Sequence, residues 1–429
     1  MIGGGLAGSE AAWQAARLGV GVDLYEMRPV TTTPAHKTEH LAEIVCSNSL
    51  KSDQPYNASW LLKEELRKSG SLLLEVADQA RVPAGGALAV DRERFAQAVT
   101  SAIENAPGIT LHREEMVAIP DTGTVVVASG PLTPPSLSDS IRQFCGVEHL
   151  YFYDAIAPII DAASIDHDRV FAASRYDKAD GDYLNCPMSR EEYGRFYEAL
   201  QTGESVQLHA FEETRYFEAC LPIEEMARRG TDTLRFGPMK PVGLTDPRTG
   251  RNAYAVVQLR QEDLMKTAYN MVGFQNHLTF PEQRRIFRMI PGLENAEFLR
   301  LGQIHRNTYI NAPALLSASM SARSDPRVLF AGQLAGTEGY IENIATGLVA
   351  GINAARHVLG SPAWTPHPET ATGALCQYVS TPQKHFAPMN INFGLLPPAD
   401  TGGKRLGKKE RQQIVAARAL ERLTECQPA

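Results

Sequence analysis

The chain opens with Gly3-Gly4-Gly5-Leu6-Ala7-Gly8, in which Gly3, Gly5 and Gly8 fit the pattern G-x-G-x-x-G. Residues 9–19 have helical character, and the apolar run 20–25 has strand character and ends before Glu26. Glycines in this pattern let the backbone approach a pyrophosphate, whose charge the free N–H groups of the helix N-terminus meet. An acidic residue about 20 positions later accepts hydrogen bonds from ribose hydroxyls. The stretch therefore predicts a dinucleotide site that contains residues 3–8 and Glu26.

Size and composition describe a globular chain with ample core. The chain has 429 residues, of which 43% are hydrophobic and 21% charged, and this length favours two domains. No run approaches the roughly 18 apolar residues of a membrane span, and no signal peptide opens the chain, so we expect a cytoplasmic protein with no membrane partner. The formal net charge of −7 gives no global indication of nucleic acid binding, although a local basic face would still bind it.

The cysteines are scattered and include no C-x-x-C pair. They are Cys46, Cys145, Cys186, Cys220, Cys376 and Cys426. This spacing suggests neither a zinc site nor a disulfide framework, so we expect no metal and a role through thiol reactivity for any functional cysteine. An isolated cysteine is usually a buried hydrophobe. The polar run that follows Cys46, residues 47–49, favours an exposed turn instead.

A second strand, glycine loop and helix follow late in the chain. Residues 328–332 have strand character, 333–339 form a glycine-rich loop, and 340–359 predict a helix with many small residues for close packing. The N-terminus of such a helix can face the pyrimidine carbonyl of a flavin and hold the negative charge that gathers there on reduction. Cofactor contacts are expected here and at the ends of the predicted strands 117–119 and 125–129: Val117, Gly130, Gly332, Thr337, Gly339 and Tyr340.

Between the two glycine loops lies a region of mixed character, in which helical stretches alternate with strand-like runs and longer polar connections. We predict an α/β fold in which residues 1–165 and 303–429 form a Rossmann-like FAD-binding domain and residues 166–302 an inserted α+β domain. Only two residues precede Gly3, whereas a full strand needs about five. The chain is therefore expected to begin a few residues inside its first strand.

Eight blocks along the chain form a distinctive set. They are Gly-Gly-Gly-Leu-Ala-Gly-Ser-Glu (3–10), Glu-Ile-Val-Cys-Ser-Asn-Ser-Leu (43–50), Arg-Val-Pro-Ala-Gly-Gly-Ala-Leu-Ala-Val-Asp-Arg (81–92), Phe-Glu-Ala-Cys-Leu-Pro-Ile-Glu (217–224), Phe-Gly-Pro-Met-Lys-Pro-Val-Gly-Leu (236–244), Val-Val-Gln-Leu-Arg-Gln-Glu-Asp (256–263), Ile-Pro-Gly-Leu-Glu-Asn-Ala-Glu (290–297) and His-Arg-Asn-Thr-Tyr (305–309). Together they resemble the bacterial folate- and FAD-dependent tRNA (uracil-5-)-methyltransferases, essentially from end to end.

The resemblance implies methylation of a T-loop uridine of tRNA at C5. It also implies 5,10-methylenetetrahydrofolate as one-carbon donor and NAD(P)H as reductant through FAD. Uracil C5 becomes nucleophilic once a thiolate adds at C6. By resemblance Cys220 is this nucleophile, and Cys46 is a second thiol that acts as base or as alternative nucleophile. Pro222 is favoured at the first position of a helix, so Cys220 lies just ahead of a helix N-terminus, where a thiolate is stabilised.

Contacts to folate and tRNA are less specific in the sequence. His305, beside Arg306, is the candidate partner of the pterin, and a structural histidine near the domain hinge is the alternative. Lys240, Arg260 and the basic tail are candidates for the folate glutamate or tRNA phosphates. The tail, residues 404–422, holds seven basic residues, among them Lys408 and Lys409, and a solvated helix face is its alternative.

Two other functions stay open at this point. The related tRNA wobble-uridine-modifying flavoproteins share the glycine loops and block 290–297, but they normally carry a long helical C-terminal domain with no counterpart in this sequence. A non-catalytic flavin- or RNA-binding protein is the second alternative, and it would have no need of Cys46 and Cys220. The remaining four cysteines are expected to be buried or incidental.

Overall fold

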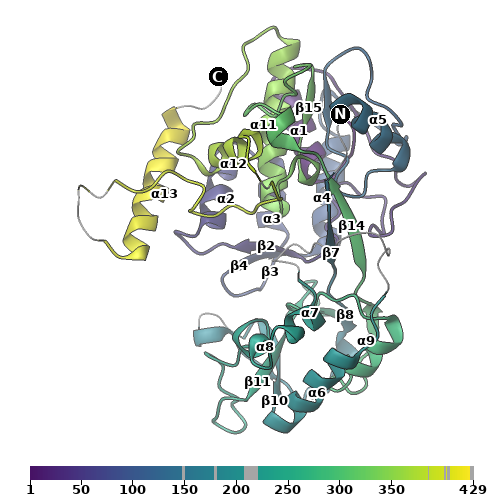
Figure 1. The fold of residues 1–429 in the computed structure, drawn as a ribbon, viewed down its shortest axis with the longest axis vertical. Helices are drawn as coiled ribbons and strands as arrows, with labels where there is room; N and C mark the ends of the chain where they lie inside the picture. The colour runs from purple at the N-terminus through teal and green to yellow at the C-terminus, as the bar shows by residue number, and fades with distance from the viewer. Residues whose placement is uncertain are drawn as a thin grey trace.

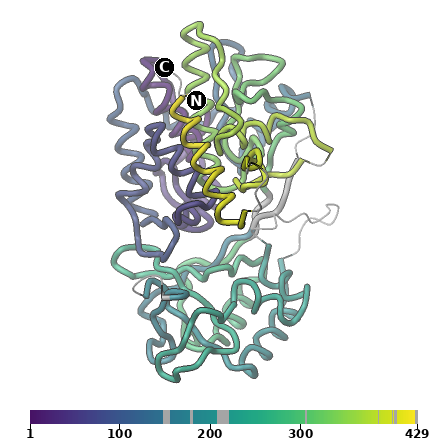
Figure 2. The backbone as a smooth tube through the Cα atoms, turned by 90° about the vertical axis from the view of Figure 1, so that its left-hand side faces the viewer, coloured from purple at the N-terminus to yellow at the C-terminus, as the bar shows by residue number. Residues whose placement is uncertain are grey.

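The computed structural model describes residues 1–146, 150–177, 181–206, 221–384, 386–400, 402 and 406–425. The chain forms two units, which lie one above the other in Figures 1 and 2. A two-stranded antiparallel ribbon of β7 (Leu150–Ala155) and β14 (Ile304–Tyr309) joins them. Each unit has its own hydrophobic core, and no described helix is both long and apolar enough to cross a membrane.

A parallel sheet forms the centre of the first unit. In it β1 (Val22–Tyr25) pairs with β5 (Ile109–His112), and β6 (Val125–Val127) pairs with β15 (Val328–Phe330). Ile2 joins the two pairs through parallel bridges to Tyr25 and Val127. The short run before Gly3 is therefore enough to connect the sheet, in the order β5, β1, Ile2, β6, β15.

Two helices cover this sheet at close approach. These are α1 (Leu6–Arg17) and α11 (Tyr340–Val358), which lie side by side in Figure 1. A Cβ on Gly347 would come within 2.3 Å of the carbonyl oxygen of Ala7, and a Cβ on Gly351 within 2.3 Å of that of Ala11. The small residues predicted to allow close packing of the late helix are confirmed, because only glycine fits at these two contacts.

The rest of the first unit surrounds this centre. Its further helices are α2 (Ala58–Lys68), α3 (Leu72–Gln79), α4 (Arg92–Glu104), α5 (Pro135–Cys145), α10 (Ala312–Leu315), α12 (Ala371–Ser380) and α13 (Lys408–Glu425). A small sheet contains β2 (Ser49–Ser52), β4 (Ala87–Val90) and β3 (Arg81–Val82), in that order. The tail helix α13 packs against α2 on the outside of the unit (Figure 2). The predicted strand at 117–119 is wrong, because this stretch has no ladder partner and runs as an extended loop.

The second unit is a six-stranded antiparallel sheet with helices packed on it. Its strands, in sheet order, are β13 (Phe298–Arg300), β8 (Ile159–Asp161), β12 (Ala268–Met271), β11 (Ala255–Gln261), β10 (Tyr183–Met188) and β9 (Phe171–Ala172). Its helices are α6 (Arg190–Thr202), α7 (Ile223–Arg228), α8 (Thr233–Phe236) and α9 (Phe280–Phe287).

The inserted α+β arrangement matches the fold class predicted from the sequence, but one boundary differs. β8 precedes residue 166 and pairs with β12 and β13, so the second unit begins before the predicted boundary. A strand of three residues carries too little periodicity to be placed from sequence.

Candidate active site

A large cavity lies at the carboxyl ends of the parallel strands, with about 1050 Å³ of empty space. We call it the dinucleotide cavity. Its walls include both predicted glycine loops, and the predicted site residues among its lining are Gly3, Gly5, Leu6, Ala7, Glu26, Gly130, Gly332 and Tyr340. This edge of an open α/β sheet is where such folds bind their ligands. Thr33 and His36 also line it, so the loop that follows Glu26 lies beside the site.

The glycines of the first loop have two distinct functions. A Cβ on Gly8 would lie 1.8 Å from the carbonyl oxygen of Gly3, and Gly3 itself has a φ of +98°, so the chain's own turn requires both. A Cβ on Gly5 would meet no atom within 4 Å, and no side chain caps the N-terminus of α1. Gly5 therefore leaves open space in front of unpaired N–H groups, which fits the approach of a pyrophosphate.

Glu26 is held as a charged acceptor at the edge of the dinucleotide cavity. Its Oε2 accepts from the N–H of Gly4 at 2.9 Å, and its Oε1 accepts from Arg28 Nε at 2.8 Å. Burial raises the pKa of Glu26, but the hydrogen bonds and positive charge of Arg28 outweigh burial, so the pKa lies below its usual value. A carboxylate has further lone pairs, so Glu26 can still accept from ribose hydroxyls.

A second cavity, which we call the thiol pocket, adjoins the first and has about 930 Å³ of empty space. Six residues line both cavities: Val45, Pro131, Leu132, Gln333, Tyr340 and Asn343. Cys46 lines only the thiol pocket, together with residues of both units: Lys51, Ile156, Gln275, Asn307, Glu338 and Gly339. The two predicted loops around Cys46 and Gly339, far apart in sequence, therefore meet at one place.

The loop that carries Cys46 is fixed to the start of α11. The N–H groups of Cys46 and Ser47 both donate to the Tyr340 hydroxyl, at 2.9 and 3.1 Å. Burial raises the pKa of Tyr340, so the phenol stays neutral at physiological pH. Cys46 is half-buried, and its Sγ lies 3.9 Å from the carbonyl oxygen of Ala155 in β7. The thiol thus lies beside the end of β7 from which the chain continues into the second unit.

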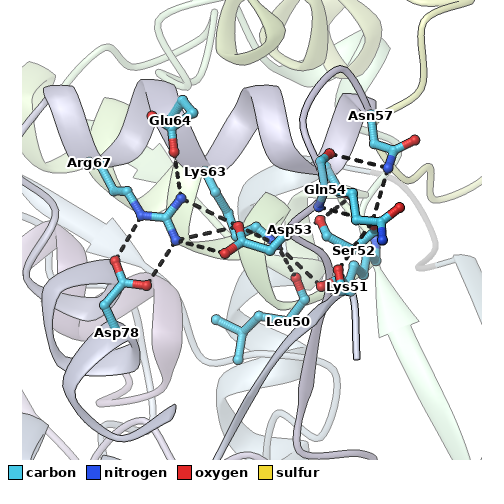
Figure 3. A network of polar contacts seen from close by, with 12 residues as sticks. Leu50, Lys51, Ser52, Asp53, Gln54, Asn57, Lys63, Glu64, Arg67 and Asp78 are labelled. Carbon is cyan, nitrogen blue, oxygen red and sulfur yellow. Dashed lines mark hydrogen bonds and ion pairs between the residues drawn. The ribbon is translucent and has the colours of Figure 1, made fainter. Parts of the chain in front are cut away.

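The strand that follows this loop, β2, is held in place by a buried lysine of α2 (Figure 3). Lys63 of α2 is fully buried, and its Nζ donates to the carbonyl oxygens of Leu50, Lys51 and Ser52 at 3.0, 3.2 and 2.8 Å. Its ion pair with Asp53 measures 3.4 Å. Burial lowers the pKa of Lys63 to about 8. These bonds hold Lys51 at a φ of +65°, a left-handed conformation that non-glycine residues rarely adopt.

The hydrogen bonds of Lys63, which we call the lysine clamp, fix the backbone of Lys51 so that its side chain extends across the start of α11. Its Nζ donates to Glu342 Oε1 at 2.6 Å and to Asn390 Oδ1 at 2.5 Å. Lys51 lines the thiol pocket and also a separate surface hollow, which Lys408 of α13 lines as well. The segment from Cys46 to Lys51 therefore forms one rigid wall of the pocket.

Several predicted cofactor contacts lie elsewhere than expected. Thr337 is fully buried and its Oγ1 donates to the carbonyl oxygen of Gly332 at 3.0 Å, so it supports the loop from behind. Gly4 is also internal, since a Cβ there would lie 2.5 Å from a Leu41 methyl group. The Val117 side chain is 58% exposed and lies outside the cavity lining, whereas the neighbouring Met116 is part of it.

The predicted folate and tRNA contacts do not gather in the described pockets. Lys240 is half-buried in the second unit and lines neither cavity, and Lys409 is exposed on α13. Arg260, a candidate for phosphate contact, is only 7% exposed, so that interpretation is wrong. Cys220 and the side chains of His305 and Arg306 lie outside the described residues, as do Lys404 and Arg405.

The incidental cysteines behave as predicted where the structure describes them. Cys145, Cys186 and Cys376 are buried. Burial raises the pKa of Cys145 to about 11 and that of Cys376 to about 12, and it raises the pKa of Cys186 as well. A neutral thiol is a poor nucleophile, so these three have no catalytic chemistry. Cys426 lies outside the described residues.

Sequence reasoning missed most polar walls of the thiol pocket. Gln275 and Asn307 come from the second unit and the connecting ribbon, and neither belongs to a motif of its own. Glu338 had a signal, because it directly precedes Gly339 in the second glycine loop. Its carboxylate lines the pocket and accepts from Gln333 Nε2 at 2.8 Å.

Known proteins resemble this chain in sequence and in fold. The family model for Glucose inhibited division protein A matches residues 1–362. The Methylenetetrahydrofolate--tRNA-(uracil-5-)-methyltransferase TrmFO of Moorella thermoacetica is 57% identical over 422 residues, which cover 98% of this chain and 96% of the relative. Its counterpart in Heliobacterium modesticaldum is 58% identical over 425 residues, covering 99% and 96%.

Among solved structures, Aquifex aeolicus GidA superposes with a TM-score of 0.71 at 18% identity, covering 99% of this chain and 72% of that one, which shows a shared fold. The second crystal form of the same protein gives a TM-score of 0.70 at 19% identity. With more than half of its residues identical over nearly its whole length, the chain belongs to the TrmFO family of methylenetetrahydrofolate--tRNA-(uracil-5-)-methyltransferases.

Proposed function

We propose that the protein methylates C5 of a T-arm uridine in tRNA, with 5,10-methylenetetrahydrofolate as one-carbon donor, FAD as bound cofactor and NAD(P)H as reductant. The observation that carries the proposal is that the two cavities meet at Tyr340 and that Cys46 lines the second of them. A dinucleotide in the first cavity would have one end at this junction. The family relatives are named for this reaction.

FAD fits the residues of the dinucleotide cavity. The open space and free N–H groups at Gly5 would receive the pyrophosphate, Glu26 the ribose, and the N-terminus of α11 the flavin ring. When bound, FAD would supply the electrons that complete the methyl group. The protein's part is to bind and orient this group and to bring thiols to the other side of the junction.

Two thiols would divide the work on the uracil ring. The Cys220 thiolate would add to C6, which makes C5 nucleophilic, and would leave again once the methyl group is formed. Cys46 would take the proton from C5, since its side chain lines the pocket and Tyr340 fixes its backbone.

The position of α7 supports the place of Cys220. The N–H of Ile223, at the start of α7, donates at 2.7 Å to the carbonyl oxygen of Gln275, which lines the thiol pocket. Cys220 precedes Ile223 by three residues, and three residues span at most about 11 Å. The start of α7 therefore lies beside the thiol pocket, which supports the proposed role of Cys220.

Mass analysis of bulk tRNA from a strain that lacks the gene tests the proposal. We expect loss of 5-methyluridine and its return when the gene is restored. Loss of a wobble-uridine modification instead would identify the protein as the related wobble-modifying flavoprotein. An unchanged nucleoside profile would favour a non-catalytic binding protein and would contradict the proposed reaction.

A further inference from the structure

Three arginines from both units converge on the backbone around Cys46. Arg92 of α4 donates to the carbonyl oxygen of Ile44 at 2.7 Å. Arg300 of β13 donates to that of Cys46 at 3.4 Å. Arg260 of β11 donates at 2.8 Å to each of the two side chains that follow the cysteine. The thiol loop is thus surrounded on its inner side by guanidinium groups.

These three guanidinium groups have fewer anionic partners than positive charges in the part of the chain that the structure describes. Among the described residues one carboxylate bonds to them, that of Glu262, which forms an ion pair with Arg92. Arg260 bonds to neutral groups in the described structure. The Nε of Arg300 is buried and has no acceptor there. Buried cations without partners are costly, so an arrangement of this kind calls for an anion.

Burial and the neighbouring positive charge of Arg92 lower the pKa of two members of the cluster. Burial, followed by the charge of Arg92, lowers the pKa of Arg300 to about 10; Arg260 is lowered as well, chiefly by burial. Both stay protonated at neutral pH. Negative charge on Cys46 has the opposite effect, because it raises the pKa of Arg92 and of Arg300. Positive charge close to a thiol stabilises its ionised form, and Arg92 and Arg300 donate to the carbonyl oxygens of Ile44 and of Cys46 itself.

The other described charges around the pocket do not remove this surplus. Tyr340 of α11 is neutral at physiological pH. Lys51 of β2 is balanced by its ion pair with Glu342 of α11, which measures 2.6 Å. Glu338 adds one negative charge to the pocket wall and opposes the cluster. Among the described residues, three positively charged guanidinium groups therefore face two carboxylates, those of Glu262 and Glu338, and positive charge is in excess.

We propose that Arg92, Arg260 and Arg300 are positioning residues that hold the Cys46 loop and stabilise the thiolate that Cys46 forms when its proton leaves to solvent. A thiol must be ionised before it can take a proton from uracil C5, so the cluster would prepare Cys46 for this role. The inference rests on the proposed function for its purpose, but its test measures ionisation and does not depend on methyl transfer. Arg260 and Arg300 also belong to the second unit, so the thiolate depends on both units being docked.

The test is the pH dependence of Cys46 alkylation in the FAD-loaded full-length protein. Iodoacetamide is applied from pH 5 to 10, and the modified Cys46 peptide is quantified by mass spectrometry. Arg300→Met should shift the midpoint of the rate profile upward by about one pH unit, which is a roughly tenfold slower reaction at pH 7. Arg300→Lys keeps the charge and should retain most of the parent rate.

Glu262→Gln tests the direction in which the pH profile shifts. Removal of the one carboxylate paired with the cluster should move the profile to lower pH, whereas a merely structural role would lower the rate in every variant. Arg288→Met is the matched control, because in the described part of the chain its guanidinium donates to the carbonyl oxygen of Ala296, in the same unit and away from Cys46. Flavin absorbance and the thermal midpoint report folding, and Glu262→Gln carries the test alone if Arg300→Met does not fold.

Identical profiles for the parent and Arg300→Met, or a shift in the same direction for Glu262→Gln, would overturn the inference. The proposed function would survive that result, since tRNA methylation is assayed separately. Conversely, a parent enzyme with the expected profile but no 5-methyluridine product would contradict the proposed function and leave the thiolate cluster standing.

Discussion

The dinucleotide cavity and the thiol pocket share six residues, yet they are built in different ways. The centre of the first cavity is a local motif, a glycine turn and a helix that follow one another between Gly3 and Arg17, and more distant segments complete its walls. The second draws its walls from distant segments of both units, including Cys46, Gln275, Asn307 and Asn390. A binding site for a common cofactor can thus be local, while the site that gives the reaction its identity depends on tertiary assembly.

The largest expected effect is a loss of FAD affinity on substitution of Gly5, which lines the dinucleotide cavity and not the thiol pocket. Gly5→Val should fold, because the backbone is extended there and a Cβ would meet no protein atom within 4 Å. The side chain would instead occupy the space for the pyrophosphate, at a cost of about 3 kcal/mol, so FAD affinity should fall about a hundredfold. The measurement is the flavin absorbance of the purified protein.

Gly21→Val is the matched control, because Gly21 is exposed and also has no atom within 4 Å of a Cβ. It should retain FAD fully. Unchanged flavin content in Gly5→Val would show that the pyrophosphate does not bind at this turn. The account of the dinucleotide cavity would then be wrong.

A second prediction loosens the thiol pocket and spares the cofactor. Lys63→Met would leave three buried carbonyl oxygens and Asp53 without their donor, which should lower the free energy of unfolding by about 3 kcal/mol. Urea unfolding at pH 7 measures this loss. Methylation should decrease more than FAD binding does, because β2 lines the thiol pocket and not the dinucleotide cavity.

Lys68→Met, at the exposed end of the same helix, should change stability by less than about 0.5 kcal/mol. Equal stability of the two variants would mean that the lysine clamp contributes little. The contrast between a locally built cavity and an assembled one would then lose its main energetic support.

The third prediction concerns a buried acid under the first glycine helix. Burial, against hydrogen bonds from Gln14 and Ser71, raises the pKa of Glu10 to about 7. The folded protein then holds a proton that the unfolded chain releases near its ordinary pKa of 4.5. Stability from this group is fully present below about pH 4.5 and is lost as the pH rises through about 7, by about 3 kcal/mol in total.

Urea unfolding at intervals between pH 4 and 8 tests this dependence. Glu10→Gln should flatten the decline between pH 5 and 7, whereas Glu75→Gln on the exposed face of α3 should leave it unchanged. An identical slope in the parent and in Glu10→Gln would show that the carboxyl is ionised in the folded core.

The smallest expected effect lies outside both cavities, on α13. Lys408→Ala combined with Lys409→Ala should weaken tRNA binding and reduce its salt dependence by up to about one counterion for each phosphate that a lysine no longer neutralises. The reason is that both lysines lie at the start of the tail helix, where Lys408 lines the hollow that Lys51 shares. Binding is measured by fluorescence anisotropy at several salt concentrations.

Arg195→Ala, on the exposed face of α6 in the other unit, is the control. Arg418 and Arg422 are poor choices for phosphate binding, because both pair with Glu369, at 3.2 and 3.0 Å. An unaltered salt dependence in the double variant would assign the tail to a solvated helix face.

The extent of prediction from sequence follows the same division between local and assembled structure. The glycine turns, the cap of α4 by Asp91 and the tail helix could be predicted, because each depends on neighbours in the chain. The start of the second unit at β8 and the burial of Arg260 could not, because both depend on partners far away in sequence. Cys46 was found through its motif, but the arginines that surround it carry no motif signal.

The most direct test of the central claim is trapping with tRNA that contains 5-fluorouridine, whose C5 fluorine cannot leave as a proton. The account predicts a covalent complex with the parent enzyme and with Cys46→Ala, and none with Cys220→Ala, since addition at C6 requires the nucleophilic thiol. Both variants should bind FAD and make no 5-methyluridine. A complex that survives in Cys220→Ala and disappears in Cys46→Ala would reverse the two roles, and full methylation by both variants would contradict the mechanism.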